Sequence, residues 1–233
     1  MRKVARPWLA TPRNSAIMIA ALTMGAAFAL RAQSSSPAPP AIVSEGNASG
    51  SDACAACHGS LGEGSPDGAY PRLAGLNAGY LNKQLRDYRS GSRRNPVMEP
   101  IAYGLSDEEA NRASLWFASA EPHAAPPARR DAQLIARGAI LARDGAWDRG
   151  IPPCASCHGA TGLGAGSAFP ALAGQSAPYL ERQIHAWRLG WRRNDPMGLM
   201  KGVANSLTGP ELRAAAAYYA SLPPPVASRE GKQ

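Results

Sequence analysis

The chain has 233 residues, of which 45% are hydrophobic and 18% charged, and its formal net charge is +8. This length suits one or two domains. Residues 1–33 hold five basic and no acidic side chains, which leaves 20 basic and 17 acidic ones in the remainder. The small excess of basic over acidic residues after position 33 does not support a nucleic-acid-binding protein.

Residues 1–33 have the composition of an export signal. Four basic residues (Arg2, Lys3, Arg6 and Arg13) precede an apolar run over 16–30, and Ala27-Phe28-Ala29 offers a cleavage site. The apolar run has 15 residues, fewer than the roughly 20 that a membrane-spanning helix needs. We therefore predict a cleaved leader and an exported protein. Membrane association through an uncleaved leader is the alternative.

A short motif occurs twice, as Cys54-x-x-Cys57-His58 and, 100 residues later, as Cys154-x-x-Cys157-His158. These motifs use all four cysteines of the chain. The spacing is that of c-type haem attachment, in which two thiols bond one porphyrin and the following histidine binds its iron. We predict two covalently bound haem c groups. A structural zinc site would need four N/S ligands, and a thioredoxin-like site would need a βαβ context; neither pattern is present.

The halves of the chain match beyond these motifs, which indicates a duplication. Residues 70–75 and 93–95 match 169–174 and 192–194 at an offset of 99. From Met98 onward, which matches Met200, the offset is 102. We predict an export segment over 1–33 and two domains over 34–127 and 128–233, joined by a Pro-rich linker over 122–127. The first domain carries an acidic excess and the second a basic excess. This asymmetry is expected either to orient the protein toward a charged partner or to reflect ordinary solvated surface.

Both copies predict the same helices, and no segment shows strand alternation. A middle helix is expected over 78–90 after Asn77, and its counterpart over 177–189 after Ser176. Gly- and Pro-rich segments before these helices predict loops. The last helix of each copy begins with a capping box, formed by Ser106 with Glu109 and by Thr208 with Glu211.

The two copies are expected to differ in front of their cysteine motifs. A helix is predicted over 131–143 before the second motif, whereas only the Gly/Ser/Asn-containing run 44–51 precedes the first. We therefore expect the first domain to lack a full N-terminal helix. Trp116 and Tyr218 are expected in the core, on the last helices.

Three methionines compete for the second axial position of the irons. Met98 is the only methionine between 34 and 127, and the second copy offers Met197 and Met200. Met98 and Met200 each precede their capping hydroxyl by eight residues, so they are predicted as ligands, with Met197 as the alternative. Met/His ligation raises the reduction potential and suits electron transfer. Core packing is the other role open to these methionines.

Other residues are assigned by analogy between the copies. The carbonyls of Pro71 and Pro170 are candidate acceptors for the haem histidines, with loop rigidity as the alternative role. His123 and His185 are expected at the surface. A further set offers either partners for the haem edge or ordinary surface and packing residues: Tyr80, Gln84, Arg94, Asn95, Tyr179, Gln183, Arg193 and Asn194.

Taken together, the Cys-x-x-Cys-His-Gly, Pro-x-Leu-Ala-Gly, Tyr-Leu-x-x-Gln and Arg-x-Asn segments resemble the diheme cytochromes c4, within class I. The resemblance covers about 45–222 and implies an all-α fold of two tandem class I cytochrome c domains. It further implies a periplasmic electron carrier and no catalytic residues. The expected donor is a quinol-oxidising bc complex or a dehydrogenase, and the expected acceptor a terminal oxidase. A haem subunit of a periplasmic dehydrogenase complex, or a diheme peroxidase-like enzyme, is the alternative.

Overall fold

The computed structural model describes residues 38–122 and 131–225. Within these ranges the fold is helical, without strands and with three isolated β-bridges only, as predicted. The export segment, His123 and most of the predicted linker lie outside the described residues. Among the described helices none is long and apolar enough to cross a membrane.

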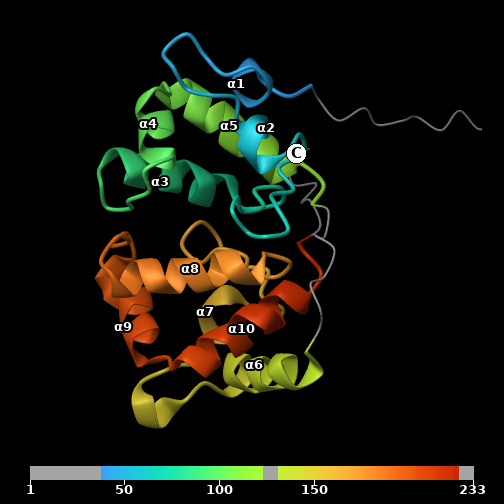
Figure 1. Ribbon diagram of the computed structural model, residues 1–233, viewed down its shortest axis with the longest axis vertical. Helices are drawn as coiled ribbons and strands as arrows, with labels where there is room; N and C mark the ends of the chain where they lie inside the picture. The colour runs from blue at the N-terminus through green and yellow to red at the C-terminus, as the bar shows by residue number, and fades with distance from the viewer. Residues whose placement is uncertain (1–37, 123–130, 226–233) are drawn as a thin grey trace, which may run out of the picture. The chain divides into compact units, whose positions relative to one another are not determined.

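From the cysteine motif onward, the described part of each copy contains four α-helices in the same order (Figure 1). In the first copy, α3 (Ala78–Arg89) packs against α4 (Met98–Tyr103) and α5 (Asp107–Ser119), and α2 (Cys54–His58) carries the cysteine motif. In the second copy, α8 (Ala177–Arg188) packs against α9 (Leu199–Ser206) and α10 (Gly209–Ser221), and α7 (Ala155–His158) carries the motif. The duplication read from the sequence is therefore present in the fold.

The helix starts follow the predicted caps with one exception. Asn77 accepts a hydrogen bond from the Tyr80 backbone at the start of α3, and both capping boxes are formed at the starts of α5 and α10. Ser176 occupies the cap position of α8, but its side chain accepts no cap hydrogen bond. The predicted cap is wrong in this detail: the hydroxyl of Ser176 is buried without a partner in the described structure.

The expected difference between the N-terminal parts of the copies is confirmed. The first copy has only the four-residue α1 (Ala41–Ser44), whose Ile42 and Val43 are buried, whereas the second has α6 (Ala132–Asp144). This longer helix packs along α10, and the approach is close at Gly138, where a Cβ atom would overlap the Ala214 carbonyl.

The buried aromatic residues of the last helices lie one position away from the predicted ones. Phe117 and Tyr219 are the buried aromatic residues of α5 and α10, and the predicted Trp116 and Tyr218 beside them are half-buried. Trp116 packs against the first core from its edge. Since each pair occupies consecutive helix positions, helical spacing alone does not select which member points inward.

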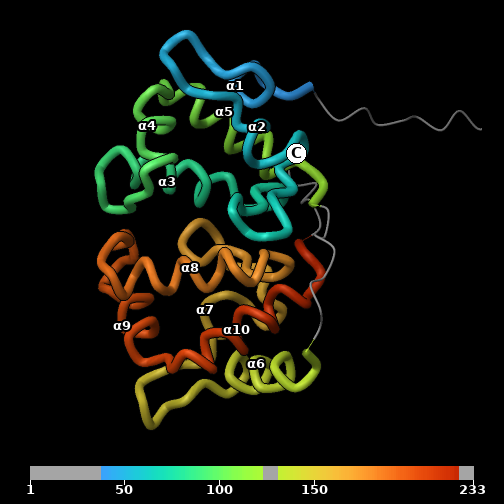
Figure 2. Tube along the Cα trace, in the orientation of Figure 1, coloured from blue at the N-terminus to red at the C-terminus, as the bar shows by residue number. Residues whose placement is uncertain are grey.

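The copies also differ immediately before the last two helices. A short 3₁₀ helix, η2 (Pro196–Gly198), occupies the position of the three extra residues in the second copy. Met197 in this helix has a left-handed backbone (φ 57°) and is 90% exposed. Between the motif helix and the middle helix, both copies run as irregular chain, which the trace in Figure 2 follows.

Candidate haem sites

The histidine of each cysteine motif is held by a backbone carbonyl. Nδ1 of His58 lies 2.9 Å from the Pro71 carbonyl oxygen, and Nδ1 of His158 lies 2.8 Å from that of Pro170. A carbonyl only accepts, so Nδ1 carries the proton and Nε2 keeps its lone pair. The predicted proline acceptors are present in both copies, and each leaves the metal-binding nitrogen of its histidine free.

Burial favours the neutral form of both rings. His58 and His158 are buried, and this burial lowers the pKa of each imidazole, while the hydrogen bond to proline opposes the shift. A neutral imidazole is the form that binds a metal ion. The two rings are therefore prepared for ligation in protonation state as well as in orientation.

The four cysteines form no disulfide with one another and line one cavity of about 870 Å³ between the copies. Both histidines line the same cavity. Burial raises the pKa of the Cys54 thiol to about 11 and also raises that of Cys154. The cysteine motifs thus open onto one continuous space, lined largely by apolar side chains from both copies.

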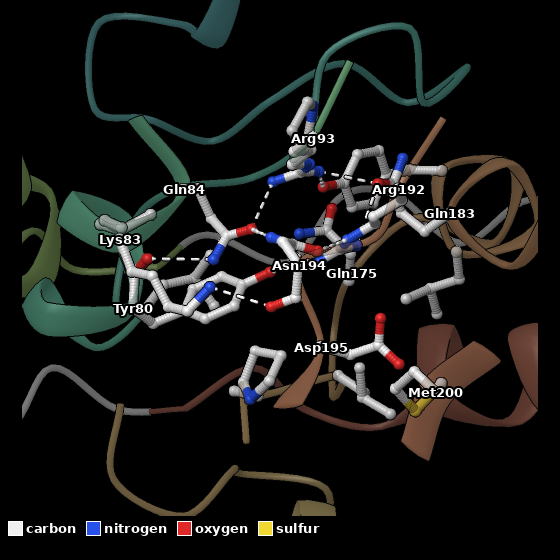
Figure 3. A pocket seen from close by; sticks show the side chains of 18 of the residues that line it. Tyr80, Lys83, Gln84, Arg93, Gln175, Gln183, Arg192, Asn194, Asp195 and Met200 are labelled. Carbon is white, nitrogen blue, oxygen red and sulfur yellow. Dashed lines mark hydrogen bonds between the residues drawn. The ribbon is translucent and has the colours of Figure 1, made fainter. Parts of the chain in front are cut away.

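The three methionines also line this cavity but differ in exposure. Met98 begins α4, where Asn95 accepts a hydrogen bond from its backbone nitrogen, and Met200 lies in the first turn of α9. Both side chains are half-buried, and Figure 3 shows Met200 beside Asp195 at the pocket. Met197, by contrast, is almost fully exposed.

A polar network joins the copies beside the cavity (Figure 3). We call it the inter-copy network; its members are Tyr80, Gln84, Arg93, Tyr179, Gln183, Arg192 and Asn194. Arg93 donates to Gln84, Tyr179 and Gln183. Arg192 donates to Gln183, Tyr80 and Gln84, and its guanidinium stacks over the Trp187 ring.

The two arginines of this network are buried positive charges without a carboxylate partner. Arg93 is 6% exposed and Arg192 is 5% exposed, and neither forms an ion pair within the described ranges. An uncompensated buried charge is costly. The arrangement therefore fits a cofactor that carries carboxylates, as haem does with its two propionates.

The two members of each arginine pair have different surroundings. Arg94 and Arg193, named as candidates for the haem edge, are exposed, and the preceding Arg93 and Arg192 face the cavity. Both pairs lie in irregular chain after the middle helix, where no periodicity predicts side-chain direction.

Arg72 and Gln175 form a second contact between the copies that the sequence did not reveal. The Gln175 amide exchanges two hydrogen bonds of 3.0 Å with the Arg72 backbone, and the Arg72 side chain donates to the Ala173 carbonyl. Burial lowers the pKa of Arg72 to about 10. The available signal was a break in the repeat, since Ala171 occupies the equivalent position in the second copy.

The helical fold, the duplicated motif helices and the shared cavity define a c-type cytochrome with two haem-binding copies. The chain belongs to the cytochrome c family, whose family model matches residues 43–120 and again residues 136–223. Each matched region contains one Cys-x-x-Cys-His motif, so the chain carries two covalent haem c groups. Within the family, its duplicated architecture is that of the diheme cytochromes c4.

Relatives and solved structures agree with this assignment. A thiosulfate dehydrogenase electron acceptor of Stutzerimonas stutzeri is 49% identical over 172 residues, which cover 73% of this chain and 79% of the relative. The structure of thiosulfate dehydrogenase (TsdBA) from Marichromatium purpuratum aligns with a TM-score of 0.72 and 41% identity over 78% of this chain. This chain spans only 39% of that longer chain. Reduced cytochrome c4 from Pseudomonas stutzeri aligns with a TM-score of 0.67 and 34% identity, over 72% and 93% of the two chains.

Proposed function

We propose that the protein is an exported diheme electron carrier that accepts electrons from a dehydrogenase. The observation that carries this proposal is the 49% identity to a protein named as a thiosulfate dehydrogenase electron acceptor. The similarity to part of the TsdBA chain supports the same donor. A thiosulfate dehydrogenase is therefore our first candidate donor, ahead of a quinol-oxidising bc complex, and a terminal oxidase is the proposed acceptor.

The proposed iron ligands are His58 with Met98 and His158 with Met200. Haem supplies an iron that gains and loses one electron. The thiols of each motif would hold the ring, the prolyl carbonyls orient the histidines, and the methionines would supply the remaining iron ligands. Met200 is preferred to Met197 because it lies in the first turn of α9 and is half-buried, whereas Met197 is 90% exposed.

The polar residues beside the cavity have a proposed role in holding the haem carboxylates. Arg93 and Arg192 are the proposed partners, because each guanidinium is buried against neutral oxygen acceptors only. Guanidinium–carboxylate pairs are strong when partly desolvated. The same two residues join the copies, so haem binding and the packing of the copies are proposed to depend on each other.

The proposed location is the periplasm, with residues 1–33 removed on export and domains over 34–127 and 128–233. An uncleaved leader would instead give a membrane-attached carrier. Mass spectrometry of the exported protein distinguishes these two products.

The function is tested by stopped-flow mixing of the oxidised holo-protein with a thiosulfate dehydrogenase and thiosulfate. We expect rapid reduction of both haems, and none when the enzyme or thiosulfate is omitted. A protein that stays oxidised with this donor but is reduced by a bc complex would redirect the proposal to the quinol pathway.

The alternative of a peroxidase-like enzyme requires an open or displaceable iron position. Adding carbon monoxide to the reduced protein and peroxide to each redox state tests it. We expect neither ligand to bind rapidly, because both irons have a thioether ligand in the proposal. Fast binding at one haem, with turnover of peroxide, would favour the enzyme.

A further inference from the structure

A second cleft, of about 280 Å³, lies between the copies and is lined without any acidic residue. Its charged residues are Arg93, Arg94, Arg182 and Arg192, with His185 and Ala186 beside them. The cleft has several times the volume that a water molecule occupies, about 30 Å³. It is large enough for a small ion with part of its hydration shell.

The cleft adjoins the haem cavity, and the residues common to both linings are Tyr88, Arg93, Asn95, Arg182, Gln183 and Arg192. Its remaining residues from α8 and the following turn lie on the far side of the helix. Leu180, Ile184 and Trp187 line the haem cavity and not the cleft, whereas His185, Ala186 and Leu189 line the cleft and not the haem cavity. With 3.6 residues per helical turn, these two sets face away from each other. A haem in its own cavity therefore leaves the His185 side of the cleft open.

The duplication provides an internal comparison for this cleft. In the equivalent position formed by α3, the Asp87 carboxylate accepts from Lys83 at 2.5 Å and from the Asn194 amide at 2.6 Å. Asp87 is thus a negative charge built into the chain between one cation and one amide from opposite copies.

The offset of 99 maps each member of that set onto the cleft. Arg182 is the counterpart of Lys83, Asn95 is the counterpart of Asn194, and Ala186 is the counterpart of Asp87. All three counterparts line the cleft. The cation and the amide are kept, and the carboxylate is lost.

The backbone around the lost carboxylate is unchanged. The Asp87 carbonyl accepts from the Arg93 backbone at 3.0 Å, and the Ala186 carbonyl accepts from the Arg192 backbone at the same distance. The cross-copy bonds also repeat: the Arg94 backbone donates to Trp191 at 2.6 Å, and that of Arg193 donates to Ser92 at 2.7 Å. Loss of the carboxylate therefore leaves a preformed position for a negative charge.

Two of the four cations of the cleft are available to bind such a charge. In the described structure, Arg94 and Arg182 form no ion pair. Asp67 is close enough for Arg182 to contribute to the lowering of its pKa. It does not line the cleft, and it already accepts from Ser65 and the Ala69 backbone.

We propose that this cleft binds a small oxygen-bearing anion, which takes the place that the Asp87 carboxylate fills in the equivalent position. Its ligands are the guanidinium groups of Arg182 and Arg94 and the Asn95 amide. The site is independent of which protein reduces the haems. Charge-assisted hydrogen bonds from guanidinium groups to an oxyanion supply its affinity.

The test is calorimetric titration of the full-length holo-protein with sodium sulfate at constant ionic strength. We expect saturable binding of one sulfate per chain, weakened about tenfold or more in Arg182→Ala. Ala186→Asp should also weaken it at least about tenfold, because the introduced carboxylate occupies the site. Arg137→Ala removes a matched charge from α6, away from the cleft, and should leave the affinity within about twofold of the wild type.

A second readout uses the haems themselves. A bound anion stabilises ferric iron relative to ferrous iron. Adding sulfate should therefore lower the reduction potentials of the wild type, whereas adding it to the Ala186→Asp variant should leave that variant's potentials unchanged. Absence of saturable sulfate binding, or an Ala186→Asp variant that folds with two haems and binds sulfate as the wild type does, would overturn the proposal.

Discussion

Arg93 and Tyr179 join the two copies directly: Nη2 of Arg93 donates a 2.9 Å hydrogen bond to the Tyr179 hydroxyl. The reciprocal bond runs from Arg192 to the Tyr80 hydroxyl at 3.2 Å. Each copy thus supplies one cation and one phenol to the contact. The position that faces the proposed haem carboxylates is consequently built by both copies together.

Tyr179→Phe should destabilise this contact modestly. Arg93 keeps Gln84 and Gln183 as acceptors, so we expect the free energy of unfolding to fall by about 1 kcal/mol. Urea unfolding of the holo-protein, followed by circular dichroism, measures this change. A double-mutant cycle with Arg93→Ala should show coupling of about 0.5 kcal/mol or more. Additive effects would mean that the bond contributes nothing specific.

The methionine assignment predicts distinct effects for three variants. Met98→Ala and Met200→Ala should each open one iron to carbon monoxide and lower one reduction potential, because a thioether favours ferrous iron. Met197→Ala should change neither property, since that side chain is exposed. A spectroscopic redox titration of the three variants measures this. If Met197→Ala opened the second iron and Met200→Ala did not, the ligand would be Met197.

The close crossing of α6 and α10 depends on Gly138. A methyl group there would overlap the Ala214 carbonyl, so Gly138→Ala should lower the free energy of unfolding by about 1–3 kcal/mol. Gly209→Ala at the start of α10 is the matched control, because its Cβ would meet only the Arg213 side chain at ordinary contact distance. Thermal unfolding of both holo-variants makes the comparison. If Gly138→Ala and Gly209→Ala had equal melting temperatures, α6 and α10 would accommodate the added methyl group without loss of stability.

The capping box of α10 predicts a loss of stability in acid. The pKa of Glu211 falls from 4.5 to about 2, chiefly through the hydrogen bond from Arg149, with Thr208 contributing. Because the folded state keeps this carboxylate ionised to lower pH than the unfolded chain does, its contribution is complete above pH 4.5. The contribution is then lost as the pH falls from 4.5 toward about 2.

Glu211→Gln tests this contribution. Gln keeps the capping hydrogen bond but loses the charge that faces Arg149. We therefore expect a loss of about 0.2–1 kcal/mol in unfolding free energy at pH 7 and a flatter dependence of stability on pH below 4.5. Glu108→Gln is the control, because Glu108 is an exposed residue paired only with Arg112. If the unfolding free energies of the wild type and Glu211→Gln fell in parallel as the pH is lowered, the Glu211 carboxylate would not contribute to this loss of stability in acid.

Local features of the chain were predictable where neighbours in sequence decide them. The capping boxes of Ser106 and Thr208 formed as predicted because both partners lie within one helical turn. The short α1 followed from the absence of a helical pattern before Cys54. Ser176 forms no cap hydrogen bond, and its hydroxyl lies beside the opposite copy, where a Cβ at Gly68 would be 2.6 Å from it.

The sequence by itself determined the cofactor chemistry, since two thiols and a histidine at fixed spacing attach one haem wherever the motif lies. It also determined the duplication and, through it, the number of haems. The tertiary structure alone decided which arginine of each pair turns inward and that Ala186 leaves a cationic cleft where its counterpart position holds Asp87. These outcomes depend on side chains about 100 residues apart being brought together, and short-range periodicity carries no information about such pairs.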